Sequence, residues 1–246
     1  RDWSVTGVQT CALPISLKGV LGTQRISDPG PTGLETPSPG AMATWTRGDI
    51  WFVEEYEARL VSVGTNGLLT GRIELAGSCY AAASSRPGFV DTTPGPGDEL
   101  ILVSSRGSAC AITADRRERH LLDDSHWSRY GLQPPGALSG VASDVNGILY
   151  LTAPWDHTIY RRSPDGQLGR FAGNQRSGVA AEGVPAALAS LQGPTSPAIG
   201  PDRNLYFTEP ERGVIRFVDA SGALRSLNRQ IGRASCREEC RSRWSP

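Results

Sequence analysis

Two segments of the chain repeat one another, and they decide its fold. The first contains GILYLT at residues 147–152 and TIYRR at 158–162, and the second contains NLYFT at 204–208 and VIRFV at 214–218. Aromatic and β-branched residues dominate each run, which is typical of short strands. The repetition indicates one structural unit that occurs more than once.

The spacing inside the two copies is the same. The aromatic residue of the first run lies nine residues before the isoleucine of the second, from Tyr150 to Ile159 and from Tyr206 to Ile215. A glycine follows seven residues later in each copy. Glycine at such a position is typical of the tight turn that joins two antiparallel strands.

The same spacing locates two earlier copies. Trp51 and Leu60 define the first of them, which also keeps the turn glycine. Ile101 and Cys110 define the second, which has Arg117 at the glycine position. This second copy has therefore diverged most, and its Cys110 is expected in the core at the position of Leu60.

The copies follow one another at intervals of 48 to 57 residues. With 29 glycines and 18 prolines in 246 residues, the composition favours many short strands joined by turns. Units of this length with four strands each are typical of propeller blades. We therefore predict an all-β fold, a β-propeller fragment of about four four-stranded blades in an open or incomplete ring. The expected blades are 40–77, 78–122, 136–173 and 194–227, with an insertion at 174–193 that could contain a short helix over residues 185–191.

The two ends of the chain are expected not to be native. Residues 5–15, VTGVQTCALPI, resemble an in-frame translation of a sequencing adapter, and residues 231–246 resemble the opposite adapter. We therefore assign 1–16 and 231–246 to such artefacts and 17–230 to the biological fragment. Three of the five cysteines lie in these ends, so a zinc or nucleic-acid tail is not predicted there. The two that remain, Cys79 and Cys110, could pair in a disulfide.

Charge and hydropathy exclude some classes of function. The whole chain has 25 basic and 25 acidic residues, and removing five arginines and three acids with the ends leaves 20 and 22. Near-neutrality argues against a nucleic-acid partner. No apolar run is long enough to span a bilayer. No signal peptide is visible, and because the true N-terminus is expected to be missing, the location stays open, with export or an extracellular site as one expectation.

The repeated segments resemble the NHL-repeat β-propellers. The resemblance rests on FAGN at 171–174, GVPAALASLQGP at 183–194 and GPDRNLYFTE at 200–209, and on GVASDVNGILY at 140–150. It implies a ring that usually has six blades, of which four are present here. The family favours an acidic residue three positions after the aromatic. Two copies keep it, as Glu54 and Glu209, and the other two have Ser104 and Ala153 at that position. That acid is expected to accept hydrogen bonds in a turn.

No motif of catalysis or metal binding is found. The three histidines form no pair with the spacing of a metal site, so His120 and His126 are expected to be isolated surface residues and His157 a turn residue. The sequence has no nucleophile elbow. Pro94 to Gly97 leads into a strand instead of a helix and is expected to be a turn. We therefore predict no metal and no cofactor.

Topology predicts a binding face. In an up-and-down blade, the turn between the second and third strands opens on the same face as the connection that leaves the fourth strand. The residues expected to converge there are Tyr56, Glu57, Trp155, Asp156, His157, Arg176, Glu211 and Arg212. Trp155 is the most informative, because an indole at a turn either binds a partner or packs on the neighbouring blade, and packing is the slightly favoured interpretation.

The predicted function is binding without catalysis. We expect a rigid module that recognises a protein or a glycan within a larger NHL-repeat protein. The alternative is a fragment of a six-bladed propeller enzyme of the lactonase or lyase kind, which would need acids or histidines on the first strands, near the axis. Those strands are small and apolar, and Asp144 is their one expected candidate ligand. Unpaired edges predict that the chain alone is marginally stable or prone to aggregate.

Overall fold

A computed structural model describes residues 39–45, 48–54, 59–64, 68–77, 79 and 88–227. The chain divides into two compact units, 1–39 and 40–246, and the strands belong to the second, apart from the first residue of the first strand. The adapter-like ends and the predicted site residues Tyr56 and Glu57 lie outside the described residues. Within the described part, no helix is long and apolar enough to cross a membrane.

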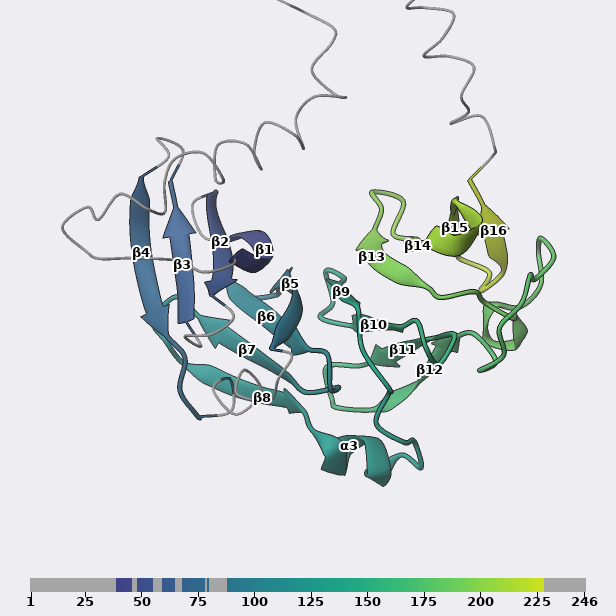
Figure 1. Ribbon diagram of the computed structural model, residues 1–246, viewed down its shortest axis with the longest axis horizontal. Helices are drawn as coiled ribbons and strands as arrows, with labels where there is room; N and C mark the ends of the chain where they lie inside the picture. The colour runs from purple at the N-terminus through teal and green to yellow at the C-terminus, as the bar shows by residue number, and fades with distance from the viewer. Residues whose placement is uncertain are drawn as a thin grey trace, which may run out of the picture. The chain divides into compact units, whose positions relative to one another are not determined.

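Sixteen strands form four four-stranded sheets in the described part of the chain, and each sheet uses four consecutive strands in order (Figure 1). We call them blades 1 to 4 in chain order. Blade 1 contains β1 (Pro39–Trp45), β2 (Asp49–Glu54), β3 (Arg59–Val63) and β4 (Leu69–Glu74); blade 2 contains β5 (Phe89–Gly95), β6 (Glu99–Ser104), β7 (Ala109–Thr113) and β8 (Glu118–Leu122). Blade 3 contains β9 (Gly140–Ser143), β10 (Leu149–Ala153), β11 (Thr158–Arg162) and β12 (Leu168–Ala172); blade 4 contains β13 (Thr195–Ile199), β14 (Leu205–Glu209), β15 (Val214–Val218) and β16 (Leu224–Ser226). The pairings are antiparallel, and the predicted all-β fold of four four-stranded units is confirmed.

Blade 2 differs from the others in strand register. In the other three blades the predicted spacing gives the equivalent pairs Val53 with Leu60, Thr152 with Ile159 and Thr208 with Ile215. In blade 2, Cys110 pairs with Leu102, the residue directly after Ile101, so the β6–β7 hairpin is one residue shorter. A shift of one residue turns a side chain to the opposite face of the sheet. The expectation that Cys110 is in the core is confirmed, but it faces blade 1, whereas Leu60 and Ile159 face the following blade.

Apolar residues between consecutive sheets form three separate clusters. Strand β6 shows why its sequence lacks alternation. Leu100 and Leu102 pack in the cluster shared with blade 1, and Ile101 and Val103 pack in the cluster shared with blade 3. Because both faces of β6 are covered, four successive apolar residues are buried, as is expected of a strand between two layers.

Three short helical segments lie in the described connections between strands. Helix α3 (Asp124–Arg129) follows β8, and Asp123 caps it by accepting the backbone N–H groups of Ser125 and His126. In the insertion, the predicted short helix is a single 3-10 turn, η1 (Ala186–Leu188). A second 3-10 turn, η2 (Pro210–Arg212), joins β14 to β15 and ends at Gly213, whose φ is 61°.

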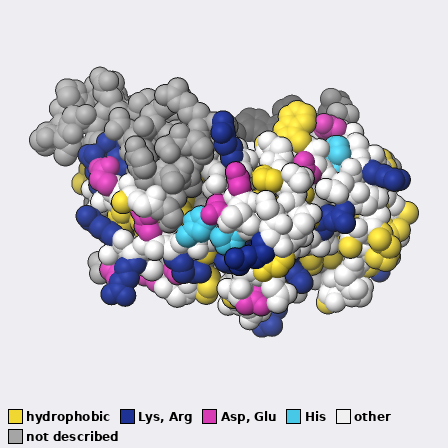
Figure 2. All heavy atoms as spheres, turned by 90° about the horizontal axis from the view of Figure 1, so that it is seen from below, with side chains coloured by type: hydrophobic (Ala, Val, Ile, Leu, Met, Phe, Trp, Pro, Cys, Tyr) yellow, Lys and Arg dark blue, Asp and Glu magenta, His cyan; other side chains and the backbone are white. Residues whose placement is uncertain are grey.

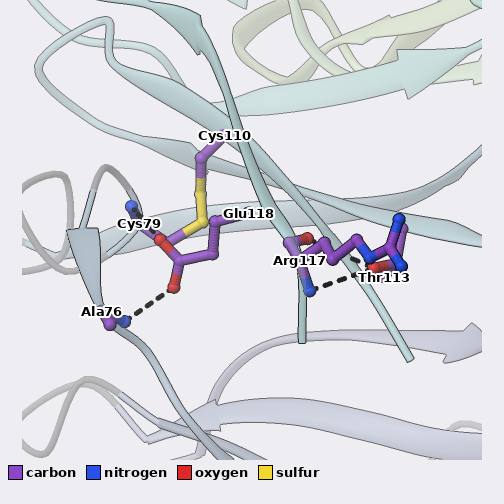
Figure 3. Close-up of a disulfide and its surroundings, with 6 residues drawn as sticks. All are labelled: Ala76, Cys79, Cys110, Thr113, Arg117 and Glu118. Carbon is purple, nitrogen blue, oxygen red and sulfur yellow. Dashed lines mark hydrogen bonds between the residues drawn. A yellow bond between two sulfur atoms is a disulfide. The ribbon is translucent and has the colours of Figure 1, made fainter. Parts of the chain in front are cut away.

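A disulfide between Cys79 and Cys110 joins the connection after blade 1 to β7 (Figure 3). The shifted register of β7 allows this disulfide to form, because it turns Cys110 toward blade 1. Beside it, the Glu118 carboxylate accepts the N–H of Ala76 at 2.6 Å and that of Cys79 at 3.1 Å. A covalent bond and two hydrogen bonds thus hold the connection between blades 1 and 2 to blade 2.

Candidate functional site

The turn between β10 and β11 exposes Trp155. The side chain is 77% exposed, so the prediction that it packs on the neighbouring blade is wrong. The N–H of His157 closes the turn by donating to the Pro154 carbonyl at 3.2 Å, and His157 has a φ of 51°, in the left-handed region. The turn is therefore closed by a backbone hydrogen bond while Trp155 is available for contact.

Asp156 connects this turn to the core. The hydroxyl of Tyr160 donates to Oδ2 of Asp156 at 3.3 Å. Tyr160 is 1% exposed and packs edge-on against Trp127, with ring centroids 4.9 Å apart. Burial, followed by the charge of Asp156, raises the pKa of Tyr160 to about 12, so the phenol stays protonated and acts as a donor. Asp156 thus holds the turn in place.

The end of the insertion joins two of the predicted turns. The N–H of Gly193 donates to Nδ1 of His157 at 3.4 Å, and the side-chain amide of Gln192 donates to Glu211 at 2.7 Å. The turn that exposes Trp155 and the η2 turn therefore both contact adjacent residues of one segment. His157 and Glu211 therefore lie next to the same segment, and convergence of the other predicted residues stays a prediction.

A buried charge network contacts the same segment. Glu209 is fully buried, and its carboxylate accepts the backbone N–H of Gln192 at 2.6 Å and the guanidinium of Arg212 at 2.8 Å. Arg216, which is 1% exposed, lies 3.7 Å from Glu209, and burial lowers its pKa. Glu209 acts as the turn acceptor that the sequence predicts for the acid after the aromatic. The acid also fixes the position of the insertion.

Arg176 lies at the other end of the insertion. Its backbone N–H donates to the Asn174 side chain at 3.0 Å, and Asn174 donates in turn to Ser190 and to the carbonyl of Leu188, each at 3.1 Å. The side chain of Arg176 is exposed. Asn174 therefore closes the insertion into a compact loop that includes the exposed Arg176.

The acidic residues on and next to the first strands of the blades differ from those that the sequence analysis predicts. Asp144 follows β9 and accepts the N–H groups of Asn146 and Ile148 at 2.9 and 2.8 Å, so it is a turn acceptor. The expectation that Asp144 is their one candidate is wrong, because β5 contains Asp91. Its carboxylate accepts the N–H of Val141 at 2.8 Å and that of Thr92 at 2.9 Å, and burial raises its pKa. Asp91 thus joins β5 to β9.

The sequence prediction also missed a histidine cluster. His120 and His126 are not isolated, because both contact Asp123 and their ring centroids lie 5.3 Å apart. The signal was present as two histidines separated from one aspartate by two residues on either side. Motifs of cysteines and histidines alone do not include the carboxylate between the two histidines, so they do not indicate this cluster.

Comparison with known proteins shows the fold. No family model matches the chain, and no curated protein matches it in sequence. Among solved structures, it is similar to virginiamycin B lyase from Staphylococcus aureus, with 18% identity, a TM-score of 0.53 and coverage of 78% of this chain and 57% of that one. It is also similar to an auxiliary nutrient binding protein from Bacteroides ovatus, with 14% identity, a TM-score of 0.56 and coverage of 78% and 47%.

A third similar structure is a putative gluconolactonase, with 12% identity, a TM-score of 0.51 and coverage of 77% of this chain and 62% of that one. The four sheets therefore match part of a six-bladed β-propeller. The chain spans between 47% and 62% of the length of these three structures. At such low identity the likeness concerns the fold alone, which lyases, lactonases and binding proteins share.

Proposed function

We propose that this chain is part of an NHL-repeat propeller that recognises a protein or a glycan without catalysing a reaction. The observation that carries the proposal is Trp155, a residue that is 77% exposed on a turn closed by a hydrogen bond from His157 to Pro154. A rigidly held aromatic side chain supplies a large contact area at a small cost in conformational entropy, which is why tryptophan is frequent at the centres of binding sites.

The neighbours of Trp155 support recognition of a polar ligand. Asp156 lies in the same turn and provides an acceptor, and Glu211 provides another on a turn that contacts the same segment as His157. The exposed Arg176 of the insertion provides donors. An aromatic surface bordered by such groups suits the apolar face of a sugar or an aromatic or aliphatic side chain of a protein. The buried Glu209 network keeps the supporting turns in one arrangement, so little ordering is required when the partner binds.

The enzyme alternative has less support. Lyase and lactonase similarities come from the fold alone. Of the four first strands as far as they are described, β5 contributes the one acidic residue, Asp91, and both of its carboxylate oxygens accept backbone N–H groups of β5 and β9. A carboxylate in this arrangement supports the contact between blades 2 and 3.

The cellular location is also part of the proposal. The bond between Cys79 and Cys110 supports a protein that matures in an oxidising compartment, since structural disulfides are rare in reducing ones. Recognition of a glycan or a protein outside the cell would agree with this. Mass spectrometry of the protein from its native source, with and without prior reduction, tests the point.

The proposal is tested with an array of immobilised oligosaccharides and a displayed peptide library as probes. Wild type should retain at least one class of probe, and Trp155→Ala should weaken that binding at least tenfold without a change in unfolding midpoint. Val145→Ala is the matched control, because Val145 is also 77% exposed but lies in the β9–β10 turn, on the opposite face. Equal loss in both variants, no retained probe, or chemical turnover of a probe would contradict the proposal.

A further inference from the structure

A second site of a different kind lies at the end of blade 2. His120 belongs to β8, Asp123 is the N-cap of α3, and His126 is the third residue of that helix. One ligand atom from each of the three side chains lies within 4.8 Å of the other two. Figure 2 shows two histidines side by side on the surface of the molecule, in agreement with the contact between the two rings.

The distances suit a small cation. Nε2 of His120 lies 3.0 Å from Oδ2 of Asp123, and Nδ1 of His126 lies 2.8 Å from Oδ1. Ligand atoms around a tetrahedral zinc ion are roughly 3.3 Å apart, because each bond is about 2.0 to 2.1 Å long. The two histidines contact different oxygens of Asp123, and the three ligand atoms lie within 4.8 Å of one another. Moving them to roughly 3.3 Å apart requires shifts that side-chain torsions can supply.

Buried neighbours hold the three residues in place. Leu121, next to His120, is 1% exposed, and Trp127, next to His126, is fully buried. The indole N–H of Trp127 donates to the carbonyl of Gly107 at 2.9 Å, which fixes α3 on blade 2. The helix cap also orients the Asp123 carboxylate. Ligands whose backbones are held in this way lose little entropy when a metal binds.

The donor set selects the class of metal. Two imidazole nitrogens and one carboxylate oxygen are ligands of borderline hardness, which suit zinc better than calcium or magnesium. The side chains of His120, Asp123 and His126 are 38%, 45% and 27% exposed, so water can reach the site. We propose that His120, Asp123 and His126 bind one zinc ion, with the fourth position open to water or to a ligand atom of another molecule.

The test is calorimetric titration of the chain with zinc chloride at pH 7.5. Cys11, Cys236 and Cys240 should first be replaced by serine, because thiolates there would also bind zinc. The expected result is one ion per chain. His120→Ala and His126→Ala should each weaken binding at least tenfold. Asp123→Asn should weaken it as well while keeping the helix, because asparagine caps helices about as well as aspartate.

The control is His157→Asn, which removes the remaining histidine and keeps a residue type that tolerates positive φ. Its zinc affinity should equal that of the starting protein. Substitution of zinc by cobalt gives a second readout, because the visible absorption of cobalt reports imidazole coordination. The proposal would be overturned if the protein did not bind zinc, or if the zinc affinity were unchanged in both His120→Ala and His126→Ala. It would also be overturned if His157→Asn lost as much zinc affinity as those two variants.

Discussion

Ile159 and Ile215 occupy the same position in successive blades, yet Ile159 is fully buried and Ile215 is 36% exposed. Ile159 packs in the cluster between blades 3 and 4. Ile215 lies on the face of blade 4 that is turned away from that cluster. Equal residues at equal positions therefore differ in how much apolar surface they bury.

This difference predicts unequal costs of truncation. Ile159→Ala should lower the free energy of unfolding by about 2 to 5 kcal/mol, because it leaves a cavity in a packed interface. Ile215→Ala should cost about 1 kcal/mol or less, since its side chain already contacts water. Urea denaturation of the two variants measures the difference. Equal losses would mean that the exposed face of blade 4 is covered in solution.

The disulfide should contribute substantially to stability. Cys79 and Cys110 are 31 residues apart, and closing a loop of that size in the unfolded chain is worth about 3 to 4 kcal/mol. Replacing both by alanine should lower the free energy of unfolding by that amount. Dithiothreitol should destabilise wild type and leave the double variant unchanged. A response of the double variant to the reductant would assign the effect to other cysteines.

Asp91 should make stability depend on pH in a direction opposite to that of most carboxylates. Burial raises its pKa in the folded protein above the ordinary value of aspartate. Its ionised form is therefore less favourable in the folded state than in the unfolded one. As pH rises from the ordinary pKa to the raised one, wild type should lose stability relative to Asp91→Asn.

Urea midpoints of wild type and Asp91→Asn at several pH values measure this effect. The difference between the two should change within that window and be constant below and above it. Other titrating groups cancel in the comparison because both proteins contain them. A difference that does not vary with pH, or that varies in the opposite direction, would contradict the inferred shift.

Glu209 should be much more important for stability than its exposed neighbour Glu211. Removing one partner of a buried ion pair leaves an uncompensated charge, which typically costs about 3 to 5 kcal/mol. Glu209→Ala leaves Arg212 and the buried Arg216 without this carboxylate, so a loss of that order is expected. Glu211→Ala removes an exposed hydrogen bond and should change stability by about 0.5 kcal/mol or less. Thermal unfolding of both variants provides the comparison.

Repetition made the fold predictable from the sequence. The spacing from Tyr150 to Ile159 locates two paired strands, and finding it four times is sufficient to predict four sheets. The same spacing misplaced Cys110 by one face, because one residue is missing from the β6–β7 hairpin. Counting positions along the chain cannot detect such a deletion, whereas pairing in three dimensions shows it directly.

The candidate sites were predictable to different degrees. Topology predicts that the turns of Trp155 and Glu211 lie on one face because antiparallel connections alternate between faces. Hydrogen bonds from Gly193 to His157 and from Gln192 to Glu211 agree with that expectation. The exposure of Trp155 could not be predicted, since it depends on what the adjacent connection leaves uncovered. The proximity of His120 and His126 depends on how the chain turns from β8 into α3, and residue types alone do not specify that turn.

The three apolar clusters are each confined to one pair of adjacent sheets, and this determines how the molecule loses its structure. Each sheet is coupled to its sequence neighbours instead of to a common centre, so cooperativity is one-dimensional. Blades 2 and 3, which have neighbours on both sides, should protect their amide protons from exchange longest. Blades 1 and 4, each with one neighbour among the described sheets, should exchange theirs sooner.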